Sequence, residues 1–182
     1  MTLAPALSKL TLTIHVSASV GWLGAIAAFL AVAITGLTTR DSSMVRAAYQ
    51  GMDWIGWFVL VPLSFASLLS GLIQALGTPW GLFRHYWVIF KLLINVLANA
   101  VLLAYMFELS AAVSMLARMD AGQLRSTSPV LHASAALLLL LVAVVLSIYK
   151  PRGVTPYGWR KQQERRVRAR QQMRRQESPL PP

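Results

Sequence analysis

Long stretches without an ionised side chain are the feature that most limits how this chain can fold. No Asp, Glu, Lys or Arg occurs between Lys9 and Arg40, and none occurs between Asp53 and Arg84. A helix that crosses the hydrocarbon core of a bilayer needs about 20 mostly apolar residues, because it rises only about 1.5 Å per residue. Each of these two stretches is long enough to hold one such helix.

The apolar stretches predict four membrane spans, three of them uncharged and the third with Lys91 near its start. We place them at about residues 10–34, 54–76, 86–107 and 130–149. Helices of soluble proteins keep a polar face, whereas residues 24–34 and 135–146 offer none. The sequence therefore predicts an all-α fold, a four-helix transmembrane bundle over residues 1–150 followed by a basic tail over residues 151–182. Pro62 lies inside the second span, where its missing N–H should kink the helix.

Positive charge is concentrated at one end of the chain. The chain is 56% hydrophobic and 13% charged, yet its formal net charge is +11 because most of the arginines follow residue 150. A nucleic-acid-binding domain would spread its Lys and Arg over a folded face. We therefore expect the lipid bilayer as a partner and do not expect nucleic acid. Lys and Arg favour the cytoplasmic side of a membrane, which predicts a cell inner (plasma) membrane protein with both termini cytoplasmic.

The tail has a composition of its own. From Tyr157 to Gln176 it consists of good helix formers and alternates Arg with Gln. Each basic residue contributes up to about 1 kcal/mol at an anionic leaflet. We expect a helix that lies along anionic lipid headgroups, with RNA or an acidic partner as the alternative. The end, from Ser178 to Pro182, is expected to be disordered.

The residues and motifs that the sequence lacks argue against several classes of enzyme and transporter. The chain has no cysteine, which excludes disulfides, thiolate metal sites and cysteine catalysis. It shows no Ser-His-Asp arrangement, no phosphate-binding glycine loop and no carboxylate within a span. A proton-driven transporter usually keeps such a carboxylate. We therefore expect a non-enzymatic membrane component, or a subunit that joins a membrane protein partner or forms a homo-oligomer.

One group of polar residues falls inside the predicted spans. It comprises His15, Gln74, Lys91, Asn95 and Asn99. A lysine at the centre of a span costs about 2.5 to 3.5 kcal/mol, so Lys91 either snorkels to the headgroups or forms an anion or carbonyl site in the bundle. His15 is predicted to lie at the same depth in the membrane as Lys91. It either makes a structural hydrogen bond, or handles protons or binds a metal or haem.

A second polar group lies at the opposite, external ends of the spans. Asp53, Glu108 and His132 could form a small cluster there. His15 and His132 should differ in depth by roughly 15 Å, given the rise of a helix and the thickness of the bilayer core. We therefore do not expect them to bind one haem iron between them.

Three segments resemble a known family. They are residues 15–24 (HVSASVGWLG), residues 77–88 (GTPWGLFRHYWV) and residues 149–162 (YKPRGVTPYGWRKQ). They are similar to a group of small bacterial integral membrane proteins known only as a domain of unknown function. This implies a four-helix membrane fold and gives no activity. The His followed by Trp-x-Gly, together with Lys91, more loosely resembles copper-resistance D-type membrane proteins, which implies copper or haem as a cofactor.

Overall fold

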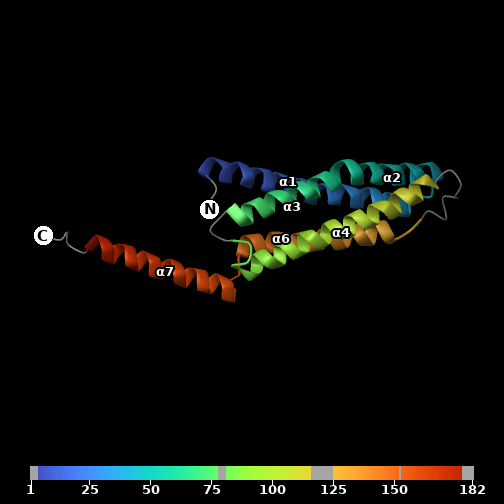
Figure 1. The fold of residues 1–182 in the computed structure, drawn as a ribbon. Coiled ribbons are helices and arrows are strands. Elements are labelled where there is room, and N and C mark those ends of the chain that lie inside the picture. The colour runs from blue at the N-terminus through green and yellow to red at the C-terminus, as the bar shows by residue number, and fades with distance from the viewer. Residues whose placement is uncertain (1–3, 78–80, 116–124, 152, 178–182) are drawn as a thin grey trace.

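The computed structural model describes residues 4–77, 81–115, 125–151 and 153–177, and most of these lie in helices (Figure 1). The helices are α1 (Pro5–Thr38), α2 (Ser42–Ile55), α3 (Val61–Gly77), α4 (Tyr86–Ser114), α6 (Ser128–Tyr149) and α7 (Pro156–Glu177). Four helical stretches are long and apolar enough to cross a membrane: α1, α2 continuing into α3, α4, and α6. The predicted all-α bundle with four membrane-spanning helices is confirmed.

The second spanning stretch is longer than the charge gap indicates. It runs from Ser42 to Gly77, whereas the sequence predicts a start near residue 54. α2 buries Val45, Ala48 and Met52 on one face while its other side remains polar, so hydropathy alone does not reveal it. The Asp41 carboxylate caps α2 by accepting the backbone N–H of Ser43 at 2.9 Å. This hydrogen bond holds the pKa of the Asp41 carboxyl below its ordinary value.

A π-helical turn over Gly56–Leu60 joins α2 to α3. The N–H of Val61 donates to the carbonyl of Gly56, five residues earlier. In a regular α-helix the ring of Pro62 would press on the carbonyl of Phe58, four residues before it. The wider turn directly before the proline moves that carbonyl away. The irregularity predicted at Pro62 therefore takes the form of a π-helical turn.

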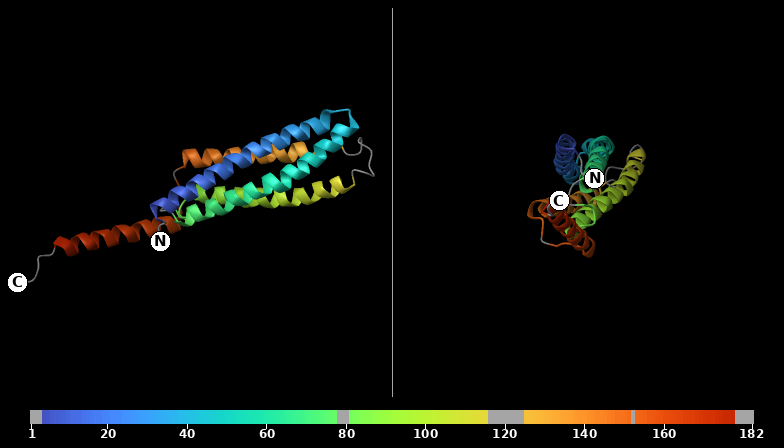
Figure 2. Two further views of the ribbon diagram at one scale, coloured as in Figure 1. Left: turned by 90° about the horizontal axis from the view of Figure 1, so that it is seen from above. Right: turned by 60° about the vertical axis from the view of Figure 1, so that its left-hand side comes forward.

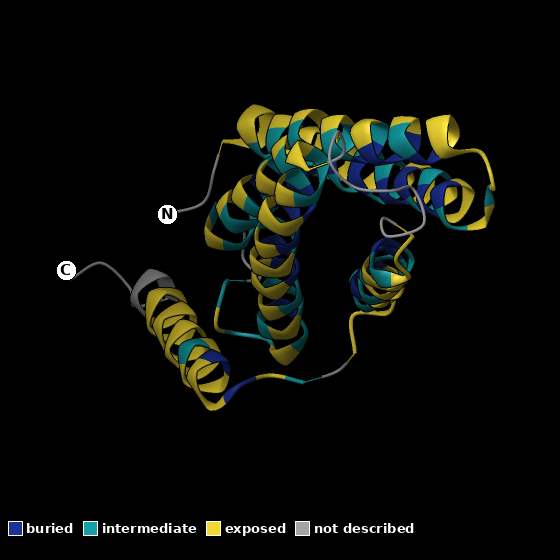
Figure 3. Ribbon diagram, turned by 90° about the vertical axis from the view of Figure 1, so that its right-hand side faces the viewer, coloured by how far each residue is buried: buried dark blue, intermediate teal, exposed yellow. Residues whose placement is uncertain are grey.

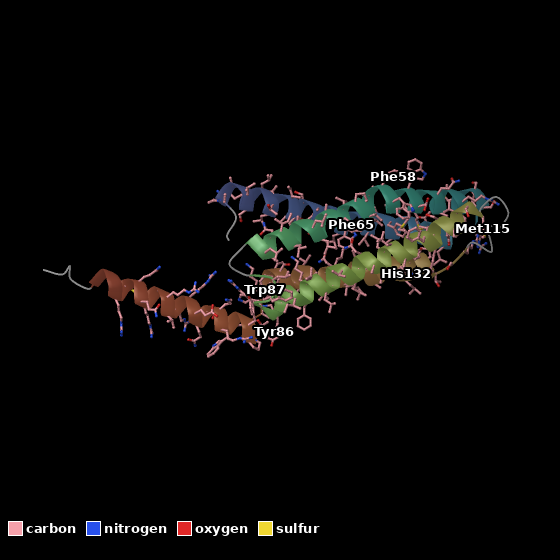
Figure 4. All side chains as sticks on the ribbon, viewed as in Figure 1. Phe58, Phe65, Tyr86, Trp87, Met115 and His132 are labelled. Carbon is pink, nitrogen blue, oxygen red and sulfur yellow. The ribbon has the colours of Figure 1, made fainter. Side chains whose placement is uncertain are left out.

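The bundle has a buried core and an apolar outer surface. One face of α1, formed by Trp22, Ile26 and Phe29, packs into the core, and Figure 3 shows buried residues facing inward while exposed ones cover the outside. Large apolar side chains point outward, such as Phe58 (Figure 4) and Leu138, at 67% and 65% exposure. A surface this apolar is compatible with lipid and not with water. The chain is therefore a membrane protein whose helices contact the bilayer.

Both described ends of the chain lie at the same end of the bundle, and α7 leads away from that end (Figures 1 and 2). Thr155, which is 6% exposed, fixes the start of α7. Its hydroxyl donates to the Phe83 carbonyl at 2.6 Å and accepts the N–H of Gly158 at 3.0 Å, as a helix cap does. Its backbone N–H donates to the carbonyl of Arg84 at 3.0 Å. The loop before α4 thus anchors the tail.

The tail helix carries its charge on every side. Exposed basic residues follow one another along α7, and Figure 4 shows nitrogen-tipped side chains both above and below the ribbon. A helix that lies flat in a membrane interface normally has one apolar face. The predicted tail helix is present over Pro156–Glu177, while residues 178–182, where we expect disorder, lie outside the described part of the chain.

Candidate functional site

Three helices bring polar side chains together near the end of the bundle that holds the termini. His15 in α1 faces α3, where its Nδ1 lies 3.0 Å from the carbonyl oxygen of Ser67 and 3.2 Å from Oγ of Ser70. Its Nε2 lies 3.4 Å from Nζ of Lys91 in α4. The structure therefore places His15 and Lys91, which the sequence assigns to one depth, in direct contact.

The hydrogen bonds define the protonation state and the tautomer of the His15 imidazole. A carbonyl oxygen can only accept, so Nδ1 must carry a hydrogen and donate it toward Ser67. The Ser70 hydroxyl donates to the carbonyls of Ala66 and Ser67, so its oxygen also accepts from Nδ1. An ammonium group can only donate, so Nε2 must accept from Lys91. His15 is thus a neutral imidazole that orients the Lys91 ammonium.

Lys91 has no carboxylate partner among the residues that the structure describes. Its one polar side-chain contact there is Nε2 of His15. A half-buried ammonium group gains little from a neutral imidazole compared with an ionised partner. The side chain points into the bundle, which fits the intramembrane-site interpretation of Lys91. Within the described residues, no carboxylate therefore balances the positive charge of the Lys91 side chain.

A cavity of about 290 Å³ lies beside the pair. Its polar lining includes His15, Gln74, Lys91 and Asn95, and leucines of several helices form the apolar walls. Leu82 and Lys150 also line it, so the cavity reaches the end of the bundle where the loop before α4 and the exit of α6 lie. The site is therefore an amphipathic pocket with two lysine side chains, Lys91 and Lys150, in its wall.

Small residues of α3 make room for the imidazole. A Cβ atom added to Gly71 would lie 2.9 Å from Cε1 of His15, closer than real contacts allow. The Ser19 and Ser67 hydroxyls are hydrogen-bonded at 2.8 Å and hold α1 against α3. The sequence shows Ser67, Ser70 and Gly71 as a polar and small-residue strip, but it does not show that this strip receives His15.

The other three predicted residues of this group donate hydrogen bonds to backbone carbonyls. Gln74 donates from Nε2 to the carbonyl of Ser8 at 3.1 Å and so joins α3 to α1. Asn95 and Asn99 donate from Nδ2 to the carbonyls of Lys91 and Asn95, one turn earlier in α4. The Oδ1 atoms of both asparagines are buried without a partner. Asn95 lines the cavity and Asn99 does not.

The three external residues do not contact one another. The Ser110 hydroxyl donates to Asp53 and accepts Nε1 of Trp57 at 2.8 Å. His132 instead contacts Ser128 and stacks on Tyr105, with ring centroids 4.5 Å apart. Glu108 is exposed and lies near Tyr105. Within the described part of the chain, no hydrogen bond or ion pair joins Asp53, Glu108 and His132 into one cluster.

Comparison of the chain with protein-family models, with curated proteins and with solved structures finds no match. The resemblance to the small bacterial membrane protein family therefore stays a prediction.

The donors around His15 do not fit a metal or a haem iron. Both ring nitrogens already have protein partners, and Nε2 faces an ammonium group that would repel a metal cation. Among the described residues, no three His, Cys, Asp or Glu side chains gather in one place. The pocket suits an anion far better than a cation.

Proposed function

We propose that the chain is a non-enzymatic membrane protein that binds the phosphate headgroup of an anionic lipid in the cavity beside Lys91. One observation carries this proposal: the Lys91 ammonium group lines an open cavity, and its one polar side-chain partner among the described residues is a neutral imidazole. A phosphate would accept charge-assisted hydrogen bonds from it, which are worth about 1.5 to 3 kcal/mol. Removing that anion would leave a charge uncompensated in the membrane.

The shape and lining of the cavity favour a lipid over a free ion. Leu12, Leu68, Leu72 and Leu92 contribute apolar walls beside the polar end. An inorganic phosphate would leave these walls without contacts, whereas the glycerol and the first methylenes of a lipid would pack on them. Among the described residues, the lining holds no carboxylate that could act with His15 as an acid–base pair. Binding therefore accounts for the site better than catalysis.

The proposal also states which end of the bundle faces the cytoplasm and which membrane holds the protein. The described ends of the chain lie at the Lys91 end of the bundle, and α7 adds a large excess of positive charge there. The cytoplasmic preference of Lys and Arg supports a cytoplasmic location for this end in the inner membrane. The loops at the other end carry fewer basic residues, diluted by Asp41 and Asp120. Partnership with another membrane protein or a second copy remains part of the prediction.

The anchored start of α7 supports contact between the tail and anionic headgroups over its first turns. Arg160 and Lys161 follow directly on the junction at Thr155. At about 1.5 Å per residue, Arg174 lies about 21 Å further along the helix than Arg160. We expect the first basic residues to meet headgroups and the later ones to project into water. A fluorophore near position 162 should therefore be quenched by a quencher attached to lipid headgroups.

The proposed lipid site is tested by replacing Lys91→Met. We expect short-chain phosphatidylglycerol to bind saturably to the purified wild-type protein in neutral detergent, and to bind at least tenfold more weakly to the variant, since the charge-assisted bonds are lost. Equilibrium binding of the radiolabelled lipid measures this, with Lys9→Met as the matched control at an exposed lysine of α1. The control should bind like the wild type.

Competition separates a lipid from a free anion. Unlabelled phosphatidylglycerol should displace the bound lipid, while phosphatidylcholine and inorganic phosphate should displace it poorly. Efficient displacement by inorganic phosphate would assign the site to a free anion. Equal affinities of the wild type and a monodisperse, helical Lys91→Met protein would show that the cavity does not bind the lipid through Lys91.

A further inference from the structure

A second cavity lies in the half of the bundle away from Lys91. It measures about 270 Å³ and is enclosed by α1, α4 and α6, with Leu60 of the π-helical turn at its side. Its lining is almost entirely apolar and shares no residue with the first cavity. Leu97 and Val101 line it and are also about half exposed on the outer surface. A ligand could therefore enter from the hydrocarbon of the bilayer.

Tyr105 offers this cavity a hydroxyl group without a partner. The residue is 8% exposed and lines the cavity. Its ring meets Phe29 edge-on, with centroids 6.4 Å apart, and stacks on His132. No described residue forms a hydrogen bond with its hydroxyl. The hydroxyl oxygen is not among the fully buried unpaired atoms of the described residues, so this phenol can still donate to a ligand in the cavity.

Trp22 of α1 adds a second unpaired group to the lining of the cavity. It is 2% exposed, and its Nε1 is buried without a hydrogen-bond partner. An indole N–H can only donate, and a phenol can donate as well. The ligand that satisfies both Trp22 and Tyr105 must therefore offer acceptor atoms. A saturated hydrocarbon chain offers none.

We propose that this cavity binds a quinone-type molecule, a neutral membrane-soluble compound with a flat ring that bears carbonyl oxygens. The carbonyls would accept from Tyr105 and, after a small rotation of the indole, from Trp22. The ring would pack among the aromatic side chains of Trp22, Phe29 and Tyr105. The ligand should be neutral, because the described residues that line the cavity include no Asp, Glu, Lys or Arg to balance a charge.

The orientation of the ligand follows from the ends of the cavity. Tyr105 and His132 lie toward the outer end, while Leu97 and Leu139 lie deeper in the bundle. Tyr105 is eight residues from Leu97, which is about 12 Å along α4. One carbonyl would meet Tyr105 at the outer end, the ring would extend inward toward Trp22, and a hydrocarbon tail would run past Leu97 into the lipid. This places the second site in the leaflet opposite to Lys91.

The test compares a decyl-tailed benzoquinone with decylbenzene, which has the same tail and no carbonyl. We expect calorimetric titration of the full-length protein in neutral detergent to show saturable binding of the quinone alone. Tyr105→Phe keeps the ring contacts and removes only the hydroxyl, so the affinity should fall about fivefold. Tyr149→Phe is the matched control, since Tyr149 is 77% exposed and lies outside the cavity.

Further variants separate this site from the first one. Ala136→Leu should abolish quinone binding by filling the cavity, and Lys91→Met should leave it unchanged. The proposal is overturned if the quinone shows no saturable binding to the wild type. It is also overturned if decylbenzene binds equally well and Tyr105→Phe binds the quinone like the wild type, because the cavity would then accept hydrocarbon only. Should Ala136→Leu fail to fold, the conservative Tyr105→Phe variant still decides the question.

Discussion

A Gly71→Val variant should fold into the membrane but lose at least tenfold in affinity for phosphatidylglycerol. Even a Cβ atom at Gly71 would lie 2.9 Å from Cε1 and 3.3 Å from Nδ1 of His15, and valine adds two methyl groups. The imidazole must therefore move away from α3 and lose its bonds to Ser67 and Ser70. Without a fixed Nε2, the Lys91 ammonium is no longer held at the cavity. Equilibrium binding of the radiolabelled lipid measures the loss.

Gly24→Val is the matched control for this prediction. Gly24 lies in α1, and a Cβ atom there would meet nothing within 4 Å. The substitution should leave both lipid affinity and thermal stability close to those of the wild type. Gly71→Val binding the lipid as tightly as Gly24→Val would mean that the position of His15 does not matter for the site.

A Gly158→Ala variant should release the tail from the bundle. The added Cβ atom would lie 2.4 Å from the backbone carbonyl oxygen of Arg84 and 2.8 Å from Cγ1 of Val154. A backbone atom cannot yield as a flexible side chain can, so the junction that holds Thr155 against Arg84 must open. We expect the first basic residues of α7 to lose their fixed place at the headgroups.

Because the natural chain has no cysteine, one fluorophore can be attached specifically at Gln162→Cys. In vesicles with a headgroup-attached quencher, its fluorescence should be strongly quenched in the otherwise wild-type protein and at least twofold less quenched with Gly158→Ala. Gly153→Ala is the control in the same junction, because its Cβ atom would meet Tyr86 at an ordinary 3.4 Å. Equal quenching in all three proteins would contradict the role given to the junction.

Charge gaps predicted the spanning helices because the cost of burying an ionised group in lipid dominates every other local preference. The gaps between charged residues did not predict most of α2. This helix is amphipathic, and the charged and polar residues on one of its faces interrupt the uncharged stretch. The gaps also could not reveal the π-helical turn before Pro62, which depends on how the backbone relieves one steric clash. These parts of the fold are decided by packing and local backbone geometry.

For the candidate site, the sequence predicts how deep each residue lies in the membrane. It does not predict which neighbouring helix the side chain faces. Counting residues puts His15 and Lys91 at one level, whereas their contact depends on how α1 and α4 are rotated. The carbonyl of Ser67 as a partner of His15 has no sequence signature, because every residue has a carbonyl. The second cavity was not predicted either, since a void arises from the shapes of side chains on three different helices.

The central claim is that four helices cross the bilayer and leave the tail and the loop before α4 on one side. Labelling single cysteines with a membrane-impermeant maleimide, in intact cells and in inverted membrane vesicles, tests it directly. Cysteines at Leu82 and Gln162 should be labelled only in inverted vesicles, and those at Ser43 and Ser126 only in intact cells. A cysteine at Leu141 should be labelled in neither. Labelling of Ser43 and Gln162 from the same side, or ready labelling of Leu141, would contradict the account.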